Sequence, residues 1–162
     1  MNNNLIIVFV RTPELGKVKT RLAKAIGDQA ALTIYKLLLK HTATVLHELS
    51  FDKVVYYSEK IENNDFWKAS LFEKKLQKGA DLGERMQQAF ETAFDRGYKK
   101  VLIIGSDLFE LTSTLIISAL EALETYDISI GPSLDGGYYL LGMKELHPAV
   151  FKNKKWGTDS VL

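Results

Sequence analysis

The sequence predicts an α/β fold, a three-layer α/β/α sandwich in which helices cover both faces of a mostly parallel mixed sheet. Two short segments, 5–10 and 100–105, are apolar apart from Lys100 and show no alternation of polar and apolar residues, which is typical of strands buried on both faces. Segments with helical spacing separate the predicted strands, as the crossovers of a parallel sheet require. With 162 residues and 46% hydrophobic content, the chain can bury this core as one domain, 1–162.

The first half of the chain alternates strand and helix. Residues 5–10 form the first strand, and a loop rich in cations and turn formers follows it. Residues 28–49 carry one apolar stripe and form the clearest helix, with Asp28 as its N-cap. Residues 53–58 form the second strand, whereas periodicity assigns no element to 59–78.

The second half continues the same alternation. A helix of apolar residues at helical spacing ends at Arg96-Gly97, and a strand, a further helix and two closing strands follow. These five elements are expected at 82–94, 100–105, from Thr112 or Ser113 to Leu123, at 127–131 and at 138–143.

The bulk composition excludes several classes of protein. The formal net charge is +1, so neither nucleic acid nor a membrane surface is an expected partner. The chain has no cysteine, which rules out disulfides, thiolate metal sites and cysteine nucleophiles and fits a reducing compartment. The N-terminal apolar run is too short for a signal peptide or a membrane span. We therefore expect a cytoplasmic protein.

The loop after the first strand gathers positive charge. Arg11, Lys17, Lys19 and Arg21 place four cations within eleven residues, and Gly16 shapes the turn. A helix that begins near Lys17 would add free N–H groups, which suits a diphosphate. The loop matches neither G-x-x-x-x-G-K-[ST] nor G-x-G-x-x-G. The alternative is a solvated basic face at the start of a helix.

A second loop, Gly79-Ala-Asp81-Leu-Gly83-Glu84-Arg85, opens a helix. Gly83 permits the close approach of a ligand, and the guanidinium of Arg85 suits a phosphate or a base edge. Asp81 is equally suited to be an N-cap, with Glu84 completing a capping box.

Two carboxylates, Asp107 and Asp135, each follow a predicted strand. Because ligands of open α/β sheets bind beyond the carboxyl ends of the strands, both acids are expected at the crevice. Hard oxygen ligands without nearby His or Cys favour Mg²⁺ or Mn²⁺. Asp135-Gly136 is also an ordinary turn dipeptide, and Glu110 is either a third ligand or the approach to the next helix.

Five ordered segments together resemble a known family: PELGKVKTRLA, GADLGERMQQAF, VLIIGSDLFELT, IGPSLDGGYYLLG and WGTDSVL. They are similar to small bacterial GT-A-type transferases, which are labelled radical-SAM/selenodomain-associated transferases or arsenosugar-biosynthesis glycosyltransferases. The resemblance implies the nucleotide-diphospho-sugar transferase fold. It also implies nucleotide or metal binding by the matching residues Arg11, Gly16, Lys17, Lys19, Arg21, Gly83, Arg85, Asp107 and Asp135.

The chain departs from the family pattern at two places. Where the family reads Cys-Pro-Asp after Gly-Ser-Asp, this chain has Leu108-Phe109-Glu110, which puts a metal role at position 110 in doubt. Family members also continue past the Trp-Gly-Thr segment, whereas this sequence stops at Leu162. An acceptor-side segment is therefore expected to lie outside it.

These features favour a metal-dependent transferase that uses a nucleotide-linked donor and a small-molecule acceptor. A divalent ion at Asp107 and Asp135, with Lys17 beside it, would stabilise charge that develops on phosphate. In glycosyl transfer from a nucleotide-sugar, the assignment that the resemblance favours, Asp135 or Asp159 would serve as base. The alternatives are nucleotidyl transfer from an NTP to a phosphorylated acceptor, which the four cations suit, and a non-catalytic nucleotide-binding domain.

Overall fold

The structure is a computed structural model that describes residues 3–134, 136–152, 154 and 156. It contains one six-stranded sheet with the strand order β3-β2-β1-β4-β6-β5. The strands are β1 (Asn4–Val10), β2 (Asp52–Tyr57), β3 (Glu73–Leu76), β4 (Lys100–Gly105), β5 (Ile128–Pro132) and β6 (Tyr138–Met143). The helices are α1 (Thr20–Ile26), α2 (Asp28–His47), α3 (Leu82–Asp95), α4 (Ser113–Thr125) and a 3₁₀ turn, η1 (Pro148–Val150).

The sheet is mostly parallel, as the sequence predicts. Strands β3, β2, β1 and β4 run parallel, whereas β6 pairs antiparallel with both β4 and β5. The central strands β1 and β4 are apolar except for their first residues, Asn4 and Lys100, and are buried on both faces. This burial explains the absence of alternation in their sequences.

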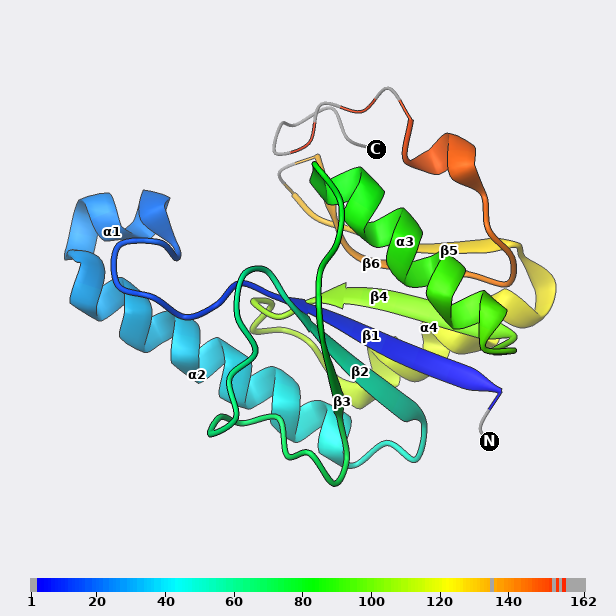
Figure 1. The fold of residues 1–162 in the computed structure, drawn as a ribbon, viewed down its shortest axis with the longest axis horizontal. Helices are drawn as coiled ribbons and strands as arrows, with labels where there is room; N and C mark the ends of the chain where they lie inside the picture. The colour runs from blue at the N-terminus through cyan, green and yellow to red at the C-terminus, as the bar shows by residue number, and fades with distance from the viewer. Residues whose placement is uncertain (1–2, 135, 153, 155, 157–162) are drawn as a thin grey trace.

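Helices cover both faces of the sheet and make the predicted three layers (Figure 1). Ile6 and Val8 of β1 point into a core that α2 and α4 complete. Leu5 and Ile7 point to the opposite face, where α3 and Phe151 cover them. Successive side chains of β1 point to opposite faces of the sheet, so this one strand contributes residues to two separate apolar layers.

Three local features differ from the sequence prediction. The helix expected near Lys17 begins at Thr20, because Lys19 takes a left-handed conformation and forms the N-cap of the short α1. Gly27, with φ of 87°, is the N-cap of α2, and Asp28 is its first residue. The negative charge of Asp28 in the first turn interacts favourably with the helix dipole, but its side chain does not form a capping hydrogen bond.

Strand β3 is the third difference. Its sequence, EKKL, is short, charged and at the edge of the sheet. Such a strand has no buried face to impose an apolar pattern, which is why periodicity finds no element in 59–78. None of the helices in the described residues is both long and apolar enough to cross a membrane.

Candidate active site

A cleft of about 970 Å³ opens at the carboxyl ends of β1, β2 and β4. Its walls come from the loop after β1 with the start of α1, from the start of α3, and from the loop after β4. The chain leaves β1 toward α2 on one face, and α3 returns it to β4 on the other. The cleft therefore lies where the order of the strands reverses, the usual place for a ligand in an open α/β sheet.

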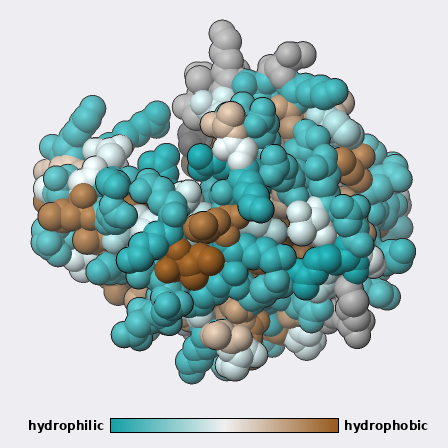
Figure 2. Space-filling view, in the orientation of Figure 1, coloured by the Kyte–Doolittle hydropathy of each residue, from teal (hydrophilic) through white to brown (hydrophobic). Residues whose placement is uncertain are grey.

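The mouth of the cleft is visible on the molecular surface. In Figure 2 the surface is hollowed between the lobe that carries α1, at the left, and the body of the molecule. Four cationic side chains and two carboxylates line the cleft: Arg11, Lys19, Arg21, Arg85, Asp81 and Asp107. The excess of positive charge suits a polyanionic ligand.

Lys19 joins the basic loop to the loop after β4. Its Nζ lies 2.7 Å from Asp107 Oδ2, although the two residues are 88 positions apart in the sequence. Among the described residues, Lys19 is the one non-glycine residue with a positive φ, 47°. A left-handed lysine costs free energy, and such strain is found mainly where a side chain must be aimed at a site.

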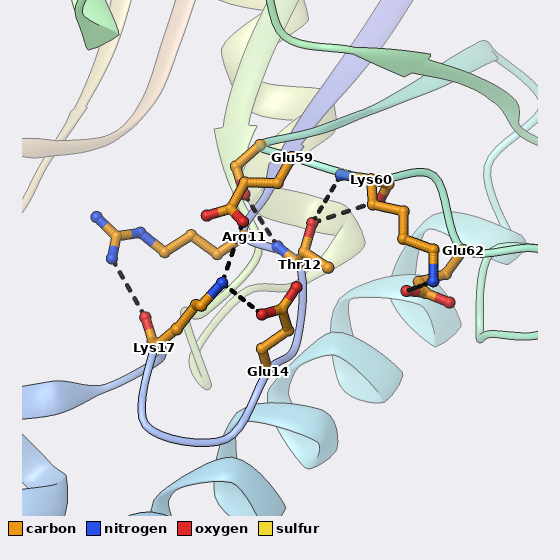
Figure 3. Close-up of polar contacts among 8 residues, drawn as sticks. Arg11, Thr12, Glu14, Lys17, Glu59, Lys60 and Glu62 are labelled. Atoms are coloured by element: carbon orange, nitrogen blue, oxygen red, sulfur yellow. Dashed lines mark hydrogen bonds and ion pairs between the residues drawn. The ribbon is translucent and has the colours of Figure 1, made fainter.

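Lys17 lies differently. Its Nζ contacts Glu14 Oε2 at 2.6 Å and Glu59 Oε2 at 3.4 Å, and it is absent from the described lining of the cleft. Hydrogen bonds first to Glu14 and then to Glu59 raise the pKa of the Lys17 ammonium above its usual value. Figure 3 shows Lys17 between these two carboxylates.

The backbone of the basic loop is folded by its own turns. The Lys17 N–H donates to the Glu14 carbonyl at 3.1 Å. Gly16 has φ of 76°, a left-handed conformation that favours glycine. The Arg11 guanidinium donates to the Lys17 carbonyl at 3.4 Å. The loop is therefore an ordered turn rather than the first turn of a helix.

A buried threonine ties this loop to the segment after β2. The Thr12 hydroxyl accepts from the Lys60 N–H at 3.2 Å and donates to the Lys60 carbonyl at 3.3 Å. The Thr12 N–H donates to the Ser58 hydroxyl at 3.1 Å. Figure 3 shows Thr12 and Lys60 facing each other across the two loops.

The loop 79–85 caps α3, which was one of the two interpretations of its sequence; ligand binding was the other. The Asp81 carboxylate accepts from the Glu84 N–H at 2.9 Å, and the Glu84 carboxylate accepts from the Ala80 N–H at 2.8 Å. This pair resembles a capping box, although Glu84 reaches the N–H of the residue before the N-cap rather than that of Asp81 itself. Arg85 lines the cleft, with its Nε donating to the Gly79 carbonyl at 3.1 Å.

Gly83 is turned toward a different neighbour. A Cβ at this position would lie 2.6 Å from the indole of Trp156. The described lining of the cleft does not include Gly83. Within the described residues, the absence of a side chain at Gly83 therefore makes room for Trp156, which packs against the α3 layer of the core.

The predicted metal site is described only in part. Asp107 lies at the rim of the cleft with its side chain half exposed, whereas Asp135 and Asp159 fall outside the described residues. Within those residues, no three His, Cys, Asp or Glu side chains gather into a metal-binding group. Magnesium sites commonly use one or two carboxylates with water and phosphate oxygens, so Asp107 fits as one such ligand.

Five uncharged polar residues of the cleft were not predicted as site residues: Thr20, Tyr35, Ser58, Gln77 and Ser106. Tyr35 lies within the apolar stripe of α2, where an aromatic residue is normally a core residue. Its hydroxyl contacts both Arg11 and Ser106. Burial is the main cause that raises the pKa of Tyr35, so the hydroxyl keeps its proton at neutral pH. The hydroxyl of Tyr35, a polar group within an otherwise apolar stripe, was the one feature of the sequence that could have indicated this role.

The sequence profile of DUF2064, described as an uncharacterized protein conserved in bacteria, matches residues 41–158. The chain belongs to this family. A curated relative of this DUF2064 protein is the 2-phospho-L-lactate guanylyltransferase of Methanocaldococcus jannaschii, which is 29% identical over 138 residues. The match covers 85% of this chain but 59% of the relative, so the chain spans less than two thirds of that protein.

Solved structures establish the fold of this DUF2064 chain. A protein from Desulfovibrio desulfuricans G20, described provisionally as a nucleotide-diphospho-sugar transferase, matches with a TM-score of 0.91 and 36% identity. The match covers 99% of this chain and 72% of that one. The fold is therefore the nucleotide-diphospho-sugar transferase fold, as the resemblance in the sequence implied.

More distant matches share the fold alone. A cytidylyltransferase from Leptospira borgpetersenii has a TM-score of 0.58 at 14% identity, over 93% of this chain and 63% of that one. The 4-diphosphocytidyl-2C-methyl-D-erythritol synthase of Anaerococcus prevotii has a TM-score of 0.61 at 12% identity, over 93% and 74%.

Proposed function

We propose that this protein is a transferase that binds a nucleotide-linked donor in the cleft between α1, α3 and the loop after β4, and that its reaction is nucleotidyl transfer. The observation that carries the proposal is the convergence of Arg11, Lys19, Arg21 and Arg85 on one cleft that also holds Asp107. A guanylyltransferase is among the relatives of the chain, which supports the same reaction.

In this reaction an oxygen of a phosphorylated acceptor attacks the α-phosphorus of a nucleoside triphosphate. The new phosphorus–oxygen bond forms as the bond from the α-phosphorus to the bridging oxygen breaks, and pyrophosphate leaves with the negative charge. Cations that already surround the leaving phosphates stabilise this charge without a covalent intermediate. Lys19, Arg21 and Arg85 are the described residues placed for this role.

Mg²⁺ or Mn²⁺ is part of the proposal. Asp107, with Asp135, would hold the ion, which when bound supplies further positive charge to the phosphates. Asp107 Oδ2 accepts a hydrogen bond from Lys19. Lys19 would therefore turn from the carboxylate to a phosphate oxygen when the donor and its cation bind.

Glycosyl transfer is the second candidate, and the match to the Desulfovibrio desulfuricans protein favours it. Here a nucleoside diphosphate would leave from the anomeric carbon, and Asp135 or Asp159 would take the proton of the acceptor hydroxyl. The radical-SAM and arsenosugar labels of the resemblance stay predictions, because none of the relatives named above carries them.

Binding measurements separate these candidates. We would titrate GTP, CTP, GDP and UDP against the protein with and without Mn²⁺, by thermal shift and calorimetry. A metal-dependent preference for a triphosphate, with pyrophosphate released on adding phosphorylated acceptors, supports nucleotidyl transfer. A preference for a diphosphate supports glycosyl transfer. No binding by any of the four, or binding unaltered in Asp107→Ala, removes the site.

A further inference from the structure

Two buried hydroxyl groups of α2 face the cleft loops. Tyr35 is 4% exposed and Thr42 is 0% exposed. They are seven residues apart, two helical turns, and so they lie on one face of the helix. The other buried residues of this helix are all aliphatic: Ala31, Leu32, Leu39, Ala43 and Leu46. A buried hydroxyl is costly unless it is hydrogen-bonded, so the partners of Tyr35 and Thr42 need an explanation.

The Tyr35 hydroxyl bridges the ends of two neighbouring strands. It accepts from the Arg11 N–H at 3.0 Å and donates to the Arg11 carbonyl at 3.1 Å. It also lies 3.3 Å from the Ser106 hydroxyl. A phenol offers one donor and two acceptor positions. The hydrogen goes to Arg11, so Ser106 fills the remaining acceptor position and the bonding capacity of Tyr35 is used completely.

Thr42 contacts the backbone carbonyl of the same serine, Ser106. Its hydroxyl lies 3.2 Å from the Ser106 carbonyl and 3.1 Å from the Leu38 carbonyl of its own helix. Ser106 is 4% exposed and directly precedes Asp107. One helix therefore contacts both the residue that begins the basic loop and the residue that precedes the carboxylate.

We infer that Tyr35 and Thr42 are positioning residues that set the separation between Arg11 and Asp107, and so the width of the cleft that receives the donor phosphates. This inference rests on the proposed nucleotide-binding function. Neither hydroxyl is a binding group in it. Tyr35 acts through the backbone of Arg11 and the hydroxyl of Ser106, and Thr42 acts through the Ser106 carbonyl.

Other hydroxyls of the same helix provide a contrast. Thr33 donates to the Gln29 carbonyl and Thr44 to the Lys40 carbonyl, both within α2 and both exposed. Among the described residues, neither hydroxyl has a hydrogen bond to the cleft loops. Thr44→Val is therefore the matched control for Thr42→Val, since the change in the side chain is identical.

The test measures the affinity of the protein for GTP and for inorganic tripolyphosphate, each with Mg²⁺, by calorimetry at 25 °C. Tyr35→Phe and Thr42→Val should raise Kd by about tenfold, the scale seen when hydrogen bonds that orient a site are removed. Thr42→Ser should restore the wild-type affinity, and Thr44→Val should leave it unchanged. If Tyr35 and Thr42 were purely structural, Tyr35→Phe and Thr42→Val would lower the thermal midpoint, but affinity would not fall in these variants and recover in Thr42→Ser.

Hydrogen exchange gives a readout that needs no ligand. In Tyr35→Phe the Arg11 amide loses its acceptor, so its exchange should accelerate while amides in the middle of β2 stay protected. If Tyr35→Phe does not fold, the Thr42→Val and Thr42→Ser pair carries the test.

The outcomes separate two failures. Wild-type protein that binds neither GTP nor tripolyphosphate overturns the proposed function, and this inference with it. Wild-type protein that binds, with unchanged affinity in folded Tyr35→Phe and Thr42→Val, overturns the positioning role alone. Unchanged exchange at Arg11 in Tyr35→Phe overturns it as well.

Discussion

Lys17 and Lys19 are two positions apart in the basic loop, but their surroundings differ. Lys19 reaches across the cleft to Asp107, whereas Lys17 is held by Glu14 and Glu59. The sequence alone treats both as phosphate ligands. The left-handed backbone at Lys19 sets the direction of its side chain, and no pattern of residue types reveals such a conformation in a lysine.

Lys19→Met should weaken GTP binding much more than Lys17→Met. Removing Lys19 takes a charged hydrogen-bond donor from the cleft, which is worth roughly tenfold or more in affinity. Lys17 is exposed and already paired, so its loss should change Kd by no more than about threefold. Calorimetry on the two variants provides the comparison, and each serves as the control of the other. Equal losses would contradict the assignment of Lys19 to the cleft.

Gly83→Ala should destabilise the protein through a clash with Trp156. The added Cβ would lie 2.6 Å from the indole, and overpacking of this kind costs about 1–3 kcal/mol. Urea unfolding measures the loss. In the Trp156→Ala background the same change should cost much less, because the clashing atoms are gone. An equal cost in both backgrounds would show that the indole is not the neighbour that matters.

At the scale of elements, the start of α3 shows how one short segment combines capping with a site residue. Asp81 accepts from a free N–H of the first turn, Glu84 accepts from the Ala80 N–H just before the helix, and Arg85 of the same turn lines the cleft. A capping role for Asp81 and Glu84 was one of the two interpretations of the sequence. The cap fixes the backbone from which the guanidinium extends.

Asp81→Ala should lower the free energy of unfolding by about 1 kcal/mol, the typical cost of losing an N-cap side chain. The matched control is Asp95→Ala, at the other end of α3, where a carboxylate opposes the helix dipole. That variant should be as stable as the wild type or slightly more stable. Urea unfolding curves test both. A destabilised Asp95→Ala, or an unaffected Asp81→Ala, contradicts the capping role.

At the scale of the whole molecule, buried tyrosines make stability depend on alkaline pH. Burial raises the pKa of Tyr138 from 10.0 to about 12 and is also the main cause that raises the pKa of Tyr57. A phenol whose pKa is higher in the folded state holds its proton more tightly there. Its contribution to stability is complete below about pH 10 and is lost as the pH rises toward 12.

The free energy of unfolding should therefore fall between pH 10 and pH 12, and Tyr138→Phe should make this fall less steep. Urea unfolding at pH 8, 10 and 11 measures the slope for both proteins. The comparison between them isolates Tyr138 from lysines and other groups that titrate in the same range. Parallel curves would show that Tyr138 ionises as readily in the folded protein as in the unfolded one.

Much of this architecture is predictable because burial imposes a pattern on the sequence. The continuous apolar runs of β1 and β4, and the helical spacing in α2, α3 and α4, each follow from the face that they bury. Charged β3 and short α1 carry no such pattern. The pairing of Lys19 with Asp107 and the bridge from Tyr35 to Ser106 depend on contacts between distant segments, which periodicity does not encode.

The edge strand β3 has a further consequence. Glu73 forms ion pairs with Arg96 and with Lys75, and all three side chains are partly exposed. A charged margin of this kind discourages a foreign strand from extending the sheet. We therefore expect this flank to resist aggregation by β-strand addition, and replacing Glu73 and Lys75 with threonine should remove that resistance.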